Sequence, residues 1–194
     1  HNIKYNGTAD TSWYDVDPDA KVFTIATSAD LYGMASLSSS NSFEGKTIYV
    51  VRDIAVNPTQ EGTLDAWKAG TGTLPTSWTP IGVTTKFNGT FDGQMHTISG
   101  IYLNTSSQYA GLFGQIWANG VVKNFYITDS LFKSTSYDIG SVAGASYGTV
   151  DSVYSNATVI AENMRSGGIV GHVPWHNTTA YIKNCWFDGQ MELG

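Results

Sequence analysis

Four short, similar stretches of this sequence each end in an aromatic residue that could bind a sugar. These aromatics are Tyr102, Tyr126, Tyr154 and Trp186. If the apolar residue before each aromatic points into a core, the aromatic faces outward and the four rings stack along one side. Exposed rings can pack on the C–H faces of sugars. They can also stack on one another to stabilise a sheet. The sequence leaves both roles open and favours the structural one.

A second group of aromatic residues falls in predicted loops and offers another ligand site. It comprises Trp117, Tyr137, Tyr147, Trp175 and His176. Trp175 belongs to an insert that lengthens one loop without disturbing the surrounding pattern. Trp117 and Trp175 therefore join the four terminal aromatics as candidate ligand-binding residues.

Carboxylates are the residues that would make this chain a glycosidase, because glycoside hydrolysis uses a pair about 5 to 10 Å apart. The acids considered for such a pair are Asp92, Asp129, Asp138, Asp151, Glu162 and Asp188. Asp129 and Asp188 fall at similar places after their predicted strands, but Asn156 stands at that point between them. No clean acidic pair emerges, so turn and surface roles are favoured and no catalytic residue is predicted.

The sequence gives little indication of a metal site or of a reactive thiol. The alternating carboxylates Asp15, Asp17 and Asp19 suggest a calcium loop, but they lack the glycine and distal glutamate of an EF-hand. No other cofactor is predicted. The single cysteine, Cys185, is interpreted as a small apolar residue of the core.

The composition explains which classes of protein can be set aside. The 194 residues carry 10 Lys and Arg against 16 Asp and Glu, so only 13% are charged and the net charge is −6. This balance argues against a nucleic-acid partner, which needs clustered basic residues. Gly, Ser, Thr and Asn are abundant, which argues against an all-helical fold. With 41% hydrophobic residues the chain can still form a core.

Two interleaved repeats indicate how the candidate residues are positioned. The first reads apolar, any residue, Gly/Asn/Ser, apolar, aromatic, and it starts at residues 98, 122, 150 and 182. The second occupies Gly111–Gly114, Ser141–Gly144 and Gly168–Gly171. A period of about 28 residues without helical signals predicts the coils of a parallel β-solenoid. Asn124 and Asn184 are expected at equivalent bends, where Asn tolerates left-handed geometry.

One helix and one insert complete the expected architecture. Residues 28–38 can form a short helix capped by Thr27 or Ser28, within an N-terminal cap spanning residues 1–45. Residues 46–194 supply the β-helix coils, interrupted by a long insert near residues 57–80. The whole chain, residues 1–194, is thus expected to form one domain, as a fragment of a larger protein.

At the second repeat the sequence resembles a known family. Gly111-Leu112-Phe113-Gly114 matches the motif that names the GLUG repeat, and the other two copies are looser versions. Segments from about residue 20 onward also resemble the lead-in found before such repeats. The resemblance implies a right-handed parallel β-helix on exported bacterial surface proteins, including non-catalytic regions of secreted peptidases and adhesin-like proteins. It implies no defined activity.

Together these observations predict a non-catalytic extracellular module, secreted or displayed at a bacterial surface, for adhesion or ligand binding. A glycan or another host surface ligand is the expected partner, with no membrane insertion and a monomeric module within a longer chain. The alternatives are a carbohydrate-active β-helix enzyme, such as a polysaccharide lyase or glycosidase, and a structural spacer.

Overall fold

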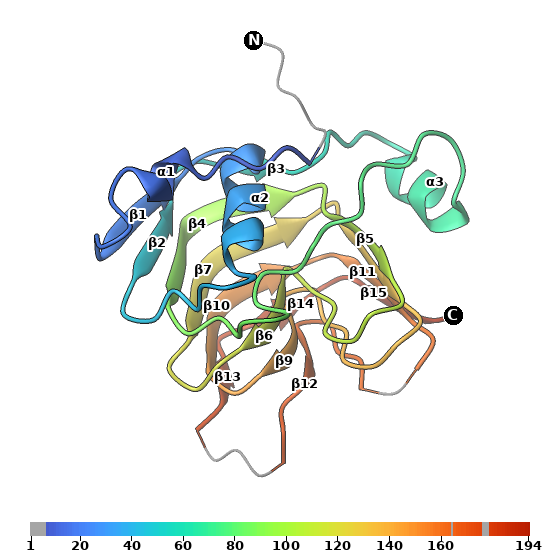
Figure 1. The fold of residues 1–194 in the computed structure, drawn as a ribbon. Helices are drawn as coiled ribbons and strands as arrows, with labels where there is room; N and C mark the ends of the chain where they lie inside the picture. Colours follow the sequence, from blue (N-terminus) through green and yellow to red (C-terminus); the bar gives the residue numbers. More distant parts are fainter. Residues whose placement is uncertain (1–6, 164, 176–178) are drawn as a thin grey trace.

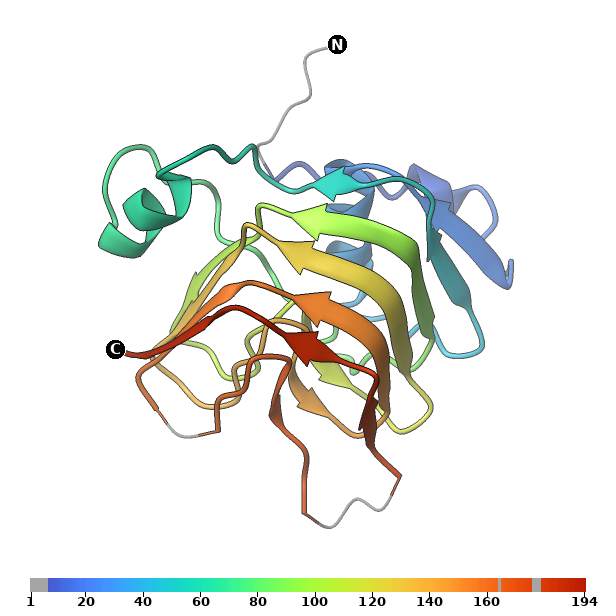
Figure 2. The same ribbon diagram turned by 180° about the vertical axis from the view of Figure 1, so that it is seen from behind.

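The computed structural model describes residues 7–163, 165–175 and 179–194. The chain winds into a parallel β-solenoid of about 6 turns with few helices, and the prediction of a parallel β-helix is confirmed. Successive coils run from the blue N-terminal end to the red C-terminal end in Figures 1 and 2.

Three parallel sheets form the sides of the solenoid. The long sheet contains β1 (Val22–Ile25), β2 (Thr47–Val50), β4 (Thr90–Ser99), β7 (Val121–Thr128), β10 (Thr149–Ser155) and β13 (Tyr181–Lys183), with β3 (Ile54–Ala55) beside β4 and β14 (Trp186–Phe187) beside β10. The four-stranded sheet contains β5 (Tyr102–Thr105), β8 (Leu131–Ser134), β11 (Thr158–Ala161) and β15 (Gln190–Leu193). The three-stranded sheet contains β6 (Phe113–Ile116), β9 (Ala143–Ser146) and β12 (Val170–His172).

A left-handed residue in the middle of each strand explains the first repeat. Asn124, Ser152 and Asn184 lie at equivalent places, with φ of 60°, 56° and 53°. Strict alternation would place residues three apart on opposite faces of a strand. The left-handed residue breaks the alternation, so that Val122 and Phe125 of β7 both point into the core.

Close approach between coils explains the glycines of the second repeat. A Cβ on Gly144 would lie 2.5 Å from the Tyr109 Cα, and one on Gly171 would lie 2.5 Å from the Ile139 nitrogen. Only glycine lets these backbones meet. Where Ser141 replaces the motif's first glycine, Gly140 stands one residue earlier and its Cβ would lie 2.6 Å from the Ile169 carbonyl oxygen.

The expected N-terminal helix is α2 (Ser28–Leu37). Thr27 and Asp30 form a reciprocal capping box: the Thr27 hydroxyl accepts the Asp30 N–H at 3.1 Å, and the Asp30 carboxylate accepts the Thr27 N–H at 3.0 Å. Leu31 and Met34 pack into the main core beside the first strands (Figure 1). Strand pairing nevertheless begins at β1, within residues 1–45 that the sequence assigned to the cap.

Two further helices were not expected from the sequence. α1 (Ser12–Asp15) is a single turn near β1. α3 (Thr63–Ala69) lies within the insert near residues 57–80 and stands away from the rest of the chain in Figure 1. Its Trp67 packs on the outer side of the four-stranded sheet, in a cluster with Tyr102 and Leu131.

The first copy of the aromatic repeat was misaligned in the sequence. Ile98 pairs with Ile127, and the partner of Val122 in β4 is Phe91. Between Asp92 and His96 the strand carries a bulge in which Gln94 and Met95 adopt positive φ. Residues 90–99 therefore form one bulged strand, and the bulge shifts Ile98 out of the place that the repeat assigned to it.

Candidate functional site

Three of the four predicted column aromatics lie in register on the outer face of the long sheet. Tyr126 pairs with Tyr154, and Tyr154 pairs with Trp186. The Tyr126 and Tyr154 rings are half-buried and tilted, with centroids 6.0 Å apart, whereas the Trp186 side chain is 69% exposed. The two tyrosines thus support each other, and Trp186 offers most of the open ring surface of this column.

Tyr102 does not belong to this column, so its prediction as an outward-facing member is wrong. It lies in β5 of the four-stranded sheet, and Thr97 occupies the place beside Tyr126. Trp67 of α3 covers its ring, with centroids 5.4 Å apart, and only 4% of Tyr102 remains exposed. The register of β4 puts Tyr102 outside the column, and a contact with the insert, which no local pattern around Tyr102 indicates, buries its ring.

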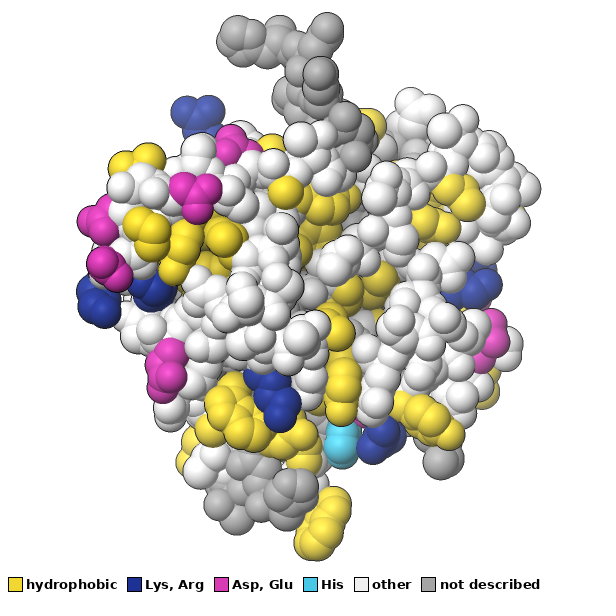
Figure 3. Space-filling model, in the orientation of Figure 1, with side chains coloured by type: hydrophobic (Ala, Val, Ile, Leu, Met, Phe, Trp, Pro, Cys, Tyr) yellow, Lys and Arg dark blue, Asp and Glu magenta, His cyan; other side chains and the backbone are white. Residues whose placement is uncertain are grey.

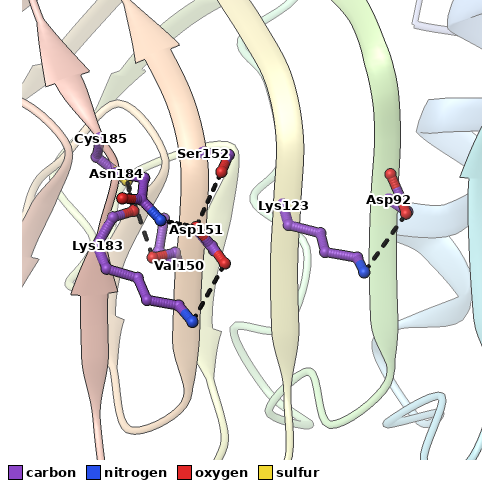
Figure 4. Close-up of polar contacts among 8 residues, drawn as sticks. All are labelled: Asp92, Lys123, Val150, Asp151, Ser152, Lys183, Asn184 and Cys185. Carbon is purple, nitrogen blue, oxygen red and sulfur yellow. Dashed lines mark hydrogen bonds and ion pairs between the residues drawn. The ribbon is translucent and has the colours of Figure 1, made fainter.

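The charges beside the column are paired with one another along the stack (Figure 4). Lys123 lies 3.6 Å from Asp92, and Lys183 lies 3.4 Å from Asp151. The predicted bend asparagines add to these pairs: Asn124 donates to Asp92 at 3.1 Å, and Asn184 donates to Asp151 at 2.9 Å. The Asn184 hydrogen bond, with smaller contributions from Ser152 and Lys183, lowers the pKa of Asp151.

A cationic and aromatic corner is built by three successive coils. Trp117 directly follows β6, and Tyr147 directly follows β9. Since β6 and β9 are neighbouring parallel strands of the three-stranded sheet, the two aromatic residues lie side by side. Their ring centroids lie 4.8 Å apart. Lys86, from the preceding coil, places its ammonium 3.9 Å from the Trp117 ring centroid and 5.4 Å from that of Tyr147. The rings hold the ammonium by cation–π attraction.

This corner borders a shallow hollow, which together with an adjoining hollow we call the Trp117 groove. The hollow has a volume of about 500 Å³ and is lined by Ser42, Glu44, Thr84, Thr85, Lys86, Asn88, Trp117 and Asn119. A second hollow of about 410 Å³ shares Glu44, Asn88 and Asn119 with it. The two hollows together form an open groove in the size range of ligand sites.

Two polar groups in the Trp117 groove have no hydrogen-bonding partner among the described residues. Asn88 is buried, and its side-chain oxygen accepts the Asn119 N–H at 3.0 Å, but its amino group has no acceptor among the described residues. The Glu44 carboxylate likewise has no hydrogen bond or ion pair in the described part of the chain. The groove therefore offers both donors and acceptors to hydroxyl groups.

The other predicted loop aromatics do not share this corner as a group. Trp117 is 39% exposed and meets Tyr147, but Tyr137 lies against Arg165, whose guanidinium is 5.4 Å from its ring centroid. Trp175 is 93% exposed, on a turn just before residues outside the description. His176 lies outside the described residues.

Asp138, for which the sequence favoured a turn or surface role, is a buried carboxylate. The Asp138 side chain is fully buried. Arg165 approaches it with Nε at 2.9 Å and Nη2 at 3.2 Å, and the Gln108 amide donates to it at 2.6 Å. His172 Nδ1 lies 3.4 Å from the same carboxylate. Gln108 comes from the coil before that of Asp138, and Arg165 and His172 come from the coil after it, so Asp138 ties three coils together at one corner.

The remaining sequence candidates show no assembled chemistry. Asp15 accepts the Thr11 hydroxyl at 2.6 Å and Asp17 accepts the Asp19 N–H at 3.2 Å, and the described residues contain no group of three or more potential metal ligands. The calcium site stays a prediction. Burial raises the pKa of the half-buried Cys185 thiol, which keeps it protonated and weakly nucleophilic.

Known proteins resemble this chain in sequence and in fold, although no protein-family model matches it. Halomucin of Haloquadratum walsbyi is 32% identical over 171 residues, covering 87% of this chain and 2% of halomucin. A "Putative Gly-rich membrane protein" of Evansella cellulosilytica is 35% identical over 80 residues, covering 39% of this chain and 9% of that protein. The chain thus spans a small part of either relative.

A solved structure supports the fold assignment. The crystal structure of a "putative immunoglobulin A1 protease" from Bacteroides ovatus superposes with a TM-score of 0.64 over 88% of this chain and 48% of that one. The two share 19% sequence identity, so the likeness concerns the fold alone. Among the described residues of the present chain, no helix has the length and apolar character needed to cross a membrane.

Proposed function

We propose that this chain is a GLUG-type β-helix module of an exported cell-surface protein, and that it binds a glycan without catalysing its cleavage. The names of the two sequence relatives, halomucin and a "Putative Gly-rich membrane protein", support the surface location. The sparse, scattered charge on the face drawn in Figure 3 does not form the clustered basic surface that a nucleic acid requires.

The observation that carries the proposal is the Trp117 groove. It combines an exposed aromatic ring with unpaired amide and carboxylate groups, and these are the groups that contact sugar rings and sugar hydroxyls. The aromatic column is the weaker candidate, because its tyrosines contact each other and its flanking charges are already paired.

The arrangement of acids supports a non-catalytic role. Asp92 and Asp151 are each ion-paired to a lysine of the neighbouring strand. A glycosidase needs one carboxyl group with a raised pKa as its general acid, whereas hydrogen bonding lowers the pKa of Asp151. Asp138 is held by arginine and glutamine in a fully buried position.

The test is a glycan array probed with the wild-type protein and the Trp117→Ala variant. We expect selective binding that falls by tenfold or more in Trp117→Ala, while the control Trp186→Ala, which removes an exposed indole elsewhere, keeps it. Loss in Trp186→Ala alone would move the site to the aromatic column. No binding to any glycan would favour the structural spacer, and release of sugar products would favour the enzyme.

A further inference from the structure

The ammonium of Lys86 differs from the other lysine ammonium groups of the groove and the long sheet in having no oxygen partner. Lys123 and Lys183 pair with aspartates, and Lys46, at the far end of the groove, donates to the Pro18 and Ala20 carbonyls at 2.5 and 3.1 Å. Among the described residues, the Lys86 ammonium lies over the rings of Trp117 and Tyr147 and has no hydrogen bond or ion pair.

The position of Lys86 limits how a sugar can use Trp117. The ammonium lies 3.9 Å from the indole centroid of Trp117, and the Tyr147 ring centroid lies 4.8 Å from the same centroid. Part of the indole surface is therefore already covered. Stacking of a neutral sugar on that covered surface would have to displace the lysine and lose its cation–π attraction. A ligand that brings a negative charge to the ammonium would instead use this contact as it stands.

From this geometry we infer that the Trp117 groove recognises an anionic sugar, with its carboxylate or sulfate on the Lys86 ammonium. This inference rests on the proposed function. The rings hold Lys86 in place before binding, so little side-chain freedom remains to be lost when the anion arrives. Charge-assisted hydrogen bonds are stronger than neutral ones, which makes Lys86 the dominant contact for such a ligand.

The rest of the groove then receives the uncharged part of the sugar. The free amino group of Asn88 donates to a ring or hydroxyl oxygen, and the Glu44 carboxylate accepts from hydroxyl groups. Glu44 lines both hollows and repels an anion from the stretch of the groove that it borders. The ligand therefore lies with its anion at Lys86 and its hydroxyls toward Glu44.

The experiment uses an array that carries uronic-acid, sialylated, sulfated and neutral glycans, followed by titration of the strongest acidic ligand and its neutralised counterpart. For a carboxylated ligand the counterpart is the methyl ester, and for a sulfated one it is the desulfated sugar. We expect anionic glycans to dominate, and binding to fall tenfold or more on neutralisation or in Lys86→Gln. Affinity should also fall as salt is added.

Two further variants keep the result interpretable. Lys86→Arg retains the charge and the contact with the rings, so it should bind within about threefold of wild type. Lys183→Gln removes the same charge from the long sheet and should bind normally. Strong binding of neutral glycans that is lost in Trp117→Ala but kept in Lys86→Gln would overturn this inference and leave the proposed function standing. Absence of binding to every glycan would overturn both.

Discussion

The interior coils and the last described coil carry the same residue pattern but bury it to different depths. Val122 and Val150 are fully buried, whereas Ile182, at the same place in β13, is 39% exposed. Phe125 of β7 is buried, while Cys185, three residues after Ile182, is half-buried. The sequence pattern therefore determines which way a side chain points, and the neighbouring coils determine how far it is buried.

This difference follows from the way a solenoid is held together. Each coil contacts only its neighbours, so an interior coil is covered on both sides. In the described chain the coil of β13, β14 and β15 pairs on one side only. Side chains that would form core in the middle of the stack thus act as partly solvated surface at this end.

The largest expected effect on the free energy of unfolding comes from truncating a core side chain in an interior coil, compared with the same kind of truncation in the last described coil. Phe125→Ala should lower the free energy of unfolding by about 3–5 kcal/mol, because it opens a cavity among fully covered side chains. Ile182→Ala should cost about 1 kcal/mol, since its side chain is already partly in water. Urea denaturation followed by circular dichroism measures both. Equal costs would mean that the last coil is packed as well as the interior ones.

Glycine substitutions extend the comparison to backbone contacts. A Cβ on Gly144 would press on Tyr109 and Asp138 backbone atoms at 2.5 and 2.6 Å, so Gly144→Ala should cost about 1–3 kcal/mol. In Gly168→Ala the new Cβ meets the ring of Phe187, a side chain of the last coil, at 2.3 Å. That ring is half-buried and can move, so we expect less than about 1 kcal/mol. The same denaturation assay applies, and a larger cost at Gly168 would show that Phe187 is fixed.

The sequence predicted the stacking of coils where the repeat is regular. Val122, Val150 and Ile182 pair as expected, as do Phe113, Ala143 and Val170 of the second repeat. The predicted register was wrong at β4, because this strand contains a bulge. The bulge residues with positive φ, Gln94 and Met95, are not glycines, so the sequence did not indicate it.

The candidate site was predicted only in part. Trp117 and Tyr147 could be named because they are aromatic residues in predicted loops. Lys86, Glu44 and Asn88 reach the same groove from earlier in the chain, so only the stacking of coils reveals them. Tyr102 was lost for the same reason, since its cover comes from the distant insert.

The smallest expected effect on the free energy of unfolding comes from the Asn–Asp hydrogen bonds on the outer face of the long sheet. The last coil forms this contact in the same way as the interior coils. Asn184 reaches Asp151 as Asn124 reaches Asp92, and these surface contacts depend little on burial by a further coil. We therefore expect Asp151→Asn and Asp92→Asn to cost similar amounts, each under about 1 kcal/mol at neutral pH.

The dependence of stability on pH then isolates the contribution of the Asp151 charge. Because hydrogen bonds lower its pKa in the folded state, Asp151 stabilises the fold above its unfolded pKa of about 4. This stabilisation is lost as the pH falls through the lower folded pKa. The gap in urea midpoint between wild type and Asp151→Asn should thus be constant above about pH 5 and should shrink as the pH falls below about 4. A gap that persists in acid would assign its cause to geometry, since the charge is then absent from both proteins.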